Sequence, residues 1–150
     1  MISLKRLSRL PNLTPARLMV RSLFMMIVKF FSNRLTQRII ILMHGELSVI
    51  HRLFSNGFDG DRSKLRLYST AEPCPMCAAA AYWAMIPKIV YGSSISFLHD
   101  LFGRQIQIGA KEILSNTPSF YEVELVGGVM EGECNDLFLK AKQLQGNQHD

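Results

Sequence analysis

A Cys-Pro-Met-Cys sequence at residues 74–77 most constrains what this chain can fold into. Pro75 suits the first turn of a helix, where its missing N–H costs nothing, and four alanines follow Cys77. Two thiols three positions apart at a helix start face one point. The helix dipole there lowers the pKa of a thiol and favours the thiolate, which binds metal. The sequence therefore predicts a metal or redox site at the start of a helix over Pro75–Met85.

The composition favours a metal site over a disulfide scaffold. The chain has 150 residues and three cysteines, an odd number that is too small for a disulfide framework. This length suits one domain with one core. No stretch reaches the roughly 18 uninterrupted apolar residues of a membrane span, so we expect no membrane partner. We expect Cys134, the third cysteine, to be a small buried residue rather than a ligand.

Positive charge is concentrated in residues 1–43. This segment holds eight basic side chains and no acidic one, whereas residues 44–150 hold nine basic and twelve acidic side chains and carry a net charge of −3. Three interpretations of the segment stay open: the first helix and strands of the domain, a basic arm that binds nucleic acid or an acidic membrane surface, or a mitochondrial-type targeting segment over residues 1–34. We expect a cytoplasmic protein, with mitochondrial targeting as the alternative.

Helices and strands are predicted to alternate after residue 43, which is typical of an α/β domain whose sheet is covered by helices. We expect the core domain over residues 44–145 and a disordered tail over residues 146–150. His99 and Asp100 are expected in a loop. Helices are predicted over Met43–Phe54, Pro75–Met85 and Glu133–Leu144, and strands over Leu65–Ser69, Lys88–Gly92 and Tyr121–Val126.

A second motif, His44-Gly45-Glu46, lies at the start of the first predicted helix. One imidazole nitrogen would join the sulfurs of Cys74 and Cys77, and three protein ligands leave one position for water on a tetrahedral zinc ion. That water would be far more acidic than bulk water. Glu46 is placed to take a proton from it and to pass the proton to a ring nitrogen and then to a leaving amine. The order His-x-Glu then Pro-Cys-x-x-Cys is the signature of zinc deaminases.

Residues 69–84 resemble the second zinc motif of the cytidine/deoxycytidylate deaminase superfamily. The sequence Glu-Pro-Cys-Pro-Met-Cys at residues 72–77 is similar to the branch that contains guanine deaminases, tRNA adenosine deaminases and nucleoside deaminases. His44-Gly45-Glu46 resembles the first motif of the superfamily. Residues 126–138 resemble the C-terminal end of that branch. In contrast, residues 17–43 lack the strand pattern and the substrate-contacting Asn that members normally carry before the first motif.

The resemblance implies a three-layer cytidine deaminase-like α/β fold, with a mixed five-stranded sheet and helices on both faces, a Zn²⁺ ion and usually a homodimer. It implies that His44, Cys74 and Cys77 bind the zinc and that Glu46 is the catalytic proton shuttle. The implied reaction is hydrolytic deamination of a nucleobase or nucleoside of the guanine, cytosine or adenosine type, by attack of zinc-bound hydroxide.

The substrate class stays open at the level of sequence. Pro73 and His99 are the candidates for contact with the substrate. A tRNA enzyme needs a basic groove near its site, and the net charge of −3 over residues 44–150 favours a small base or nucleoside instead. Two alternatives remain: a tRNA adenosine deaminase that edits the wobble position, and a catalytically impaired zinc-binding protein, because residues 17–43 lack the expected pattern.

Overall fold

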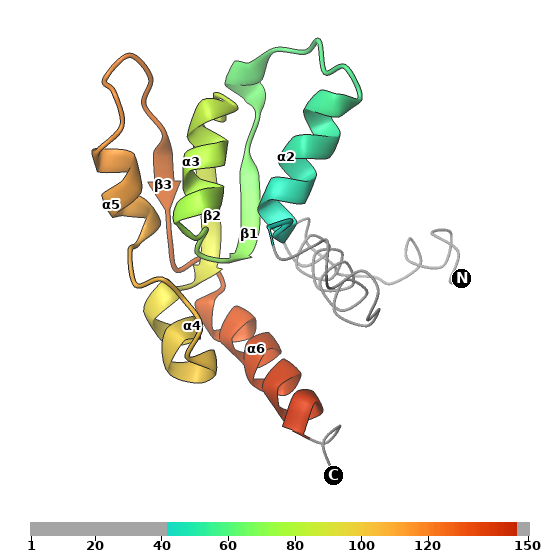
Figure 1. Cartoon of the computed structure of the whole chain (residues 1–150), viewed down its shortest axis with the longest axis vertical. Helices are drawn as coiled ribbons and strands as arrows, with labels where there is room; N and C mark the ends of the chain where they lie inside the picture. Colours follow the sequence, from blue (N-terminus) through green and yellow to red (C-terminus); the bar gives the residue numbers. More distant parts are fainter. Residues whose placement is uncertain (1–41, 147–150) are drawn as a thin grey trace.

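Helices and strands alternate along residues 42–146, the part of the chain that this computed structural model describes (Figure 1). The interpretations of residues 1–41, and of the tail beyond residue 146, lie outside the described residues. No helix within residues 42–146 combines the length and the apolar character needed to cross a membrane. The elements are α2 (Gly45–Ser55), the 3₁₀ turn η3 (Arg62–Lys64), β1 (Leu67–Ala71), α3 (Pro75–Trp83), β2 (Lys88–Ser93), α4 (Ile95–Phe102), α5 (Ala110–Ser115), β3 (Glu124–Val126) and α6 (Glu131–Gly146).

The three strands form one parallel sheet in the order β1-β2-β3. Leu67 pairs with Ile89, and Ile89 pairs with Leu125. Parallel neighbours need long crossovers, which α3 supplies between β1 and β2, and α4 with α5 between β2 and β3. The described residues thus contain three strands, all parallel, instead of the five of the predicted mixed sheet. The resemblance assigns two strands to the sequence before His44, where residues 1–41 are not described.

The core lies between α2, α3 and the sheet. Its buried cluster contains Ile50 of α2, Leu67 of β1, Ala81 of α3 and Ile89 of β2. The methyl side chain of Ala81 has no solvent exposure, which is consistent with a close approach of α3 to the sheet. Helix α3 packs against both α2 and α5 and lies between them (Figure 1). This packing fixes the relative position of the two helix starts that carry the sequence motifs.

Helix α6 packs against β2 because β2 carries a glycine at the crossing point. A Cβ atom built on Gly92 would lie 2.3 Å from Sγ of Cys134, which is closer than any real contact. Cys134 is itself 2% exposed, so the prediction of a small buried residue is confirmed. The missing side chain at Gly92 and the small side chain of Cys134 let α6 lie close to the sheet.

The segment after β2 differs from the prediction of a loop, because His99 and Asp100 lie in helix α4. The hydroxyl of Ser94 accepts the N–H of Phe97 at 3.2 Å and caps this helix, and Gly103 ends it with φ +67°. Helix α5 was not predicted either. Strand β3 covers only Glu124–Val126 of the predicted Tyr121–Val126.

Candidate metal centre

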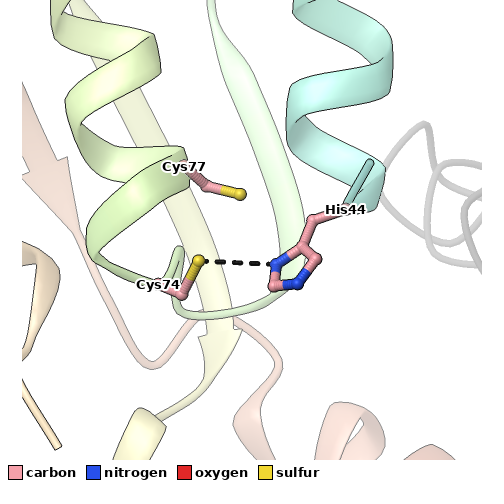
Figure 2. Close-up of side chains that lie close together, drawn as sticks. All are labelled: His44, Cys74 and Cys77. Carbon is pink, nitrogen blue, oxygen red and sulfur yellow. Dashed lines mark hydrogen bonds between the residues drawn. The ribbon is translucent and has the colours of Figure 1, made fainter. Parts of the chain in front are cut away.

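The three predicted metal ligands meet where two helices begin (Figure 2). His44 is the N-cap residue of α2, and its carbonyl accepts the N–H of Ser48 at 2.8 Å. Cys74 is the N-cap residue of α3, and its carbonyl accepts the N–H of Ala78 at 2.9 Å. Cys77 lies in the first turn of α3 and has no solvent exposure. Neither His44 nor Cys74 uses its side chain to cap its helix, so both side chains are available to a ligand.

The separations of the three side chains suit a zinc ion. Nδ1 of His44 lies 3.4 Å from Sγ of Cys74, and the ligand atoms of His44, Cys74 and Cys77 all lie within 4.8 Å of one another. Tetrahedral zinc, with Zn–S about 2.3 Å and Zn–N about 2.0 Å, sets its ligand atoms about 3.5–3.8 Å apart. One nitrogen and two sulfurs thus lie close enough to share one ion, and the assignment of these residues as zinc ligands stays a prediction. One imidazole and two thiols also form the type of donor set that zinc prefers.

The electrostatic surroundings of the three side chains favour the thiolate form of Cys74. A hydrogen bond from the thiol of Cys77 is the largest of several effects that lower the pKa of Cys74 to about 4, and a hydrogen bond from His44 adds to it. The pKa of Cys77 is raised, first because its proton is held in the hydrogen bond to Cys74 and then because it is buried. The same contact with Cys74 raises the pKa of His44. The contact therefore favours the thiolate form at Cys74 and the thiol form at Cys77.

Glu46 lies beside the three side chains without belonging to their group. It is in the first turn of α2, and its negative charge helps to raise the pKa of both His44 and Cys77. One of its carboxylate oxygens, Oε1, accepts a hydrogen bond from the hydroxyl of Ser69 at 2.5 Å. The carboxylate is thus held at the edge of the centre, close enough to influence both groups electrostatically.

Glu72 has a positioning role that was not predicted from the sequence. Its carboxylate accepts the backbone N–H of Ile95 at 2.9 Å and that of Ala110 at 2.8 Å, the first residues of α4 and α5. Its own N–H donates to the carbonyl of Ser93 at 2.7 Å. Glu72 therefore joins the turn that carries Cys74 to β2 and to two helix starts. A general rule favours a carboxylate at a helix N-terminus, but it does not say which helix start Glu72 contacts.

The two candidates for substrate contact lie in different surroundings. Pro73 directly precedes Cys74 and is fully buried. His99 is half-buried on α4, and its Nδ1 lies 3.0 Å from the carbonyl oxygen of Gln105. Neither side chain belongs to the group of possible metal ligands. A role for either residue in binding substrate remains a prediction.

The sequence of this centre matches a family model. Residues 26–93 match the zinc-binding region of cytidine and deoxycytidylate deaminases, a range that contains His44, Cys74 and Cys77. Over these residues the chain is similar to the cytidine deaminase-like superfamily. The match begins at residue 26, so it includes part of residues 17–43, which lack the strand pattern expected before the first motif. The family and the geometry of the His/Cys/Cys group together identify Zn²⁺ as the cofactor.

Individual relatives agree with the family. The chain is 31% identical over 79 residues to a probable cytosine deaminase of Schizosaccharomyces pombe, covering 49% of this chain and 48% of that protein. It is 29% identical over 98 residues to a tRNA-specific adenosine deaminase of Streptococcus pyogenes, covering 64% of this chain and 57% of the relative. The chain thus spans about half the length of the curated relatives it matches.

A solved structure supports the fold. The structure of a guanine deaminase from Nitrosomonas europaea resembles this chain with a TM-score of 0.55 and 14% identity, covering 69% of this chain and 58% of that one. At this identity the likeness concerns the fold alone. The chain therefore has a mixed α/β fold with a parallel sheet and helices, similar to that of guanine deaminase.

Proposed function

We propose that this protein is a zinc-dependent hydrolytic deaminase that replaces the amino group on the ring of a nucleobase or nucleoside by oxygen. The observation that carries the proposal is the convergence of one imidazole nitrogen and two sulfurs within 4.8 Å, beside a carboxylate. The overall reaction consumes one water molecule and releases one ammonia. The oxygen of the water forms a bond to the ring carbon, and the bond from that carbon to the amino nitrogen breaks.

Each residue of the centre has a distinct role in this proposal. His44, Cys74 and Cys77 would hold the zinc, which, when bound, lowers the pKa of a water molecule and so supplies a nucleophile at neutral pH. Glu46 takes one proton of the water and delivers it to the ring nitrogen, where it stays in the product. Glu46 then carries the second proton to the leaving nitrogen, which departs as ammonia. The carboxylate ends in the ionised form in which it began.

The proposed substrate is a free base or a nucleoside. The net charge of −3 over residues 44–150 supports this choice, because a strongly anionic substrate would be repelled by that part of the chain. A tRNA adenosine deaminase is the second candidate, favoured by the similarity to the Streptococcus pyogenes protein of that description. A homodimer and a five-stranded sheet are further proposals that rest on the resemblance, and a cytoplasmic location is a further proposal from the sequence.

The proposal is tested by zinc analysis and by ammonia release from a panel that contains guanine, cytosine, adenine, their nucleosides and tRNA. We expect one zinc per chain and ammonia from at least one small substrate. Glu46→Gln should keep the zinc and lose ammonia release by at least about a hundredfold, the lower range for general acid–base catalysis. Glu122→Gln is the matched control, because Glu122 is an exposed residue outside the centre. Full-length protein without bound zinc would contradict the proposal.

Two further outcomes separate the alternatives. Binding to tRNA that weakens steeply as salt rises, together with ammonia release from tRNA alone, would favour the tRNA enzyme. A protein that holds one zinc per chain and releases no ammonia from any member of the panel would support the catalytically impaired zinc-binding protein. In that case, Glu46→Gln and the wild-type protein would be indistinguishable in the assay.

A further inference from the structure

Helix α2 and strand β1 both contribute side chains to the buried core, and each continues from the core toward the metal centre. Ile50 and Leu67 belong to the same buried cluster. Glu46 lies four residues before Ile50 and therefore on the same face of α2, one turn closer to its start. Ser69 lies two residues after Leu67 and therefore on the same face of β1. The packing that buries the core thus also places the carboxylate opposite the hydroxyl.

The contact between these two side chains is short and specific. Oγ of Ser69 donates to Oε1 of Glu46 at 2.5 Å, at the short end of the range for a hydroxyl that donates to a carboxylate. Oγ also accepts the N–H of Ala71 at 3.3 Å, which favours pointing its hydrogen away from the strand and toward Glu46. Within residues 42–146, Ser69 is the one hydrogen-bond donor to the side chain of Glu46. Both partners are half-buried, so bulk water competes less for this bond than at the surface.

We propose that Ser69 is a positioning residue that fixes the carboxylate of Glu46 for proton transfer. This inference rests on the proposed function, because it assigns Ser69 to the proton shuttle of that reaction. The terminal torsion of a glutamate is broad, so a carboxylate with no partner rotates freely. The hydroxyl of Ser69 holds Oε1 and leaves Oε2 as the oxygen that exchanges protons. A displacement of about 1 Å in such a group can cost about a hundredfold in rate.

A matched pair of substitutions separates the hydroxyl from the shape of the side chain. Ser69→Thr and Ser69→Val have the same branched shape, both suit a strand, and only threonine keeps the hydroxyl. We expect Ser69→Val to lower kcat by about ten- to a hundredfold, with KM and zinc content within about twofold of the wild-type values. Ser69→Thr should retain at least about ten times the kcat of Ser69→Val. Equal kcat values for the two variants would overturn the proposal.

A double variant tests whether Ser69 acts through Glu46. In the Glu46→Gln background no carboxylate remains to be positioned, so Ser69→Val should add less than about twofold to the loss. If Ser69→Val acted by loosening β1, its effect would multiply with that of Glu46→Gln. Such multiplication would overturn the positioning role.

Infrared difference spectra give a readout that does not depend on activity. The spectrum of zinc-loaded wild type minus that of Glu46→Gln isolates the carboxylate bands of Glu46. We expect these bands to shift when the same difference is taken in the Ser69→Val background, and to stay near the wild-type position in the Ser69→Thr background. Unshifted bands would overturn the contact itself.

The two proposals fail in different ways. Shifted carboxylate bands in a zinc-loaded protein that deaminates no member of the panel would overturn the proposed function, and the catalytic role of Ser69 with it, while confirming the contact. An active wild type whose kcat does not change in Ser69→Val would overturn only the role of Ser69. An active wild type with a slow Ser69→Val, a faster Ser69→Thr and the non-additive double variant would support both.

Discussion

Substitution of Glu72 by glutamine should loosen the turn that carries the zinc ligands. In the wild type, the carboxylate of Glu72 accepts the N–H of Ile95 at 2.9 Å and that of Ala110 at 2.8 Å. Glutamine has one carbonyl oxygen and one amide NH₂, so it can accept one of these N–H groups and must turn a donor toward the other. Helices α4 and α5 also lose the negative charge at their starts.

The magnitude follows from these two contacts. A hydrogen bond to a charged group contributes about 1.5–3 kcal/mol, and a donor left without a partner costs about 1–3 kcal/mol when buried. Because Glu72 is half-buried, the lower part of the range applies, and we expect Glu72→Gln to lower the free energy of unfolding by about 2 kcal/mol. For a chain of this size, about 1 kcal/mol corresponds to about 2–4 °C in Tm. The expected decrease in Tm is therefore about 4–8 °C.

Thermal unfolding of the zinc-loaded protein, followed by circular dichroism, measures this decrease. Glu122→Gln makes the same chemical change at an exposed position and should leave Tm within about 1 °C. Zinc affinity, measured by competition with a chelator, should fall in Glu72→Gln because Glu72 lies two residues before Cys74. A Tm for Glu72→Gln equal to that of the control would refute the reasoning, since it would mean that the two N–H groups find water at no cost.

Three other predictions concern packing, backbone conformation and zinc removal. Gly92→Ala should destabilise the fold by about 2 kcal/mol or more in urea unfolding, because its Cβ would lie 2.3 Å from Sγ of Cys134. The control Gly132→Ala, in helix α6, should be neutral or stabilising in the same assay, because its Cβ would have nothing within 4 Å. Met85→Gly should raise Tm slightly, since Met85 has φ +57°, a conformation that costs a non-glycine residue about 1 kcal/mol. After zinc removal, iodoacetamide should modify Cys74 before Cys134, because the pKa of Cys74 is lowered to about 4 whereas burial raises the pKa of Cys134. The rate at Cys74 should be similar at pH 8 and pH 6, because its thiolate is lost only as pH falls toward about 4. A tenfold slower reaction of Cys74 for each unit of pH below 8, as measured by mass spectrometry, would contradict the lowered pKa.

The metal centre could be predicted from the sequence because each of its ligands is tied to a local signal. Pro75 marks a helix start, and the spacing of Cys74 and Cys77 within one turn directs both sulfurs to one side of it. His44 lies at the start of a helix whose apolar side chains recur at helical spacing. Local rules therefore place all three residues at helix starts, and the zinc-deaminase signature then predicts that the two starts meet.

The contacts that hold the centre in place were not predictable in the same way. Ser69 is 23 residues from Glu46 along the chain, and Glu72 is 38 residues from Ala110. Their pairing depends on how α2 lies relative to β1 and on where α5 begins, which no local pattern specifies. Helix α4 is a different case, because Ser94 and Gly103 are ordinary start and stop signals that the sequence contains. There the prediction of a loop around His99 overlooked the caps at both ends.

The negative groups of the centre lie at the positive ends of helices. Glu46 is in the first turn of α2, the thiolate of Cys74 is at the N-cap of α3, and the carboxylate of Glu72 accepts the first N–H groups of α4 and α5. Each helix start carries a partial positive charge of about half a unit, which stabilises an anion beside it. The partial positive charges at the helix starts reduce the repulsion among the negative side chains. A bound metal of charge +2 is then not the sole source of that compensation. The centre can therefore gather its anionic side chains at one edge of the sheet before zinc binds, so substitutions that shift the start of α3 should weaken zinc binding even where they leave every ligand in place.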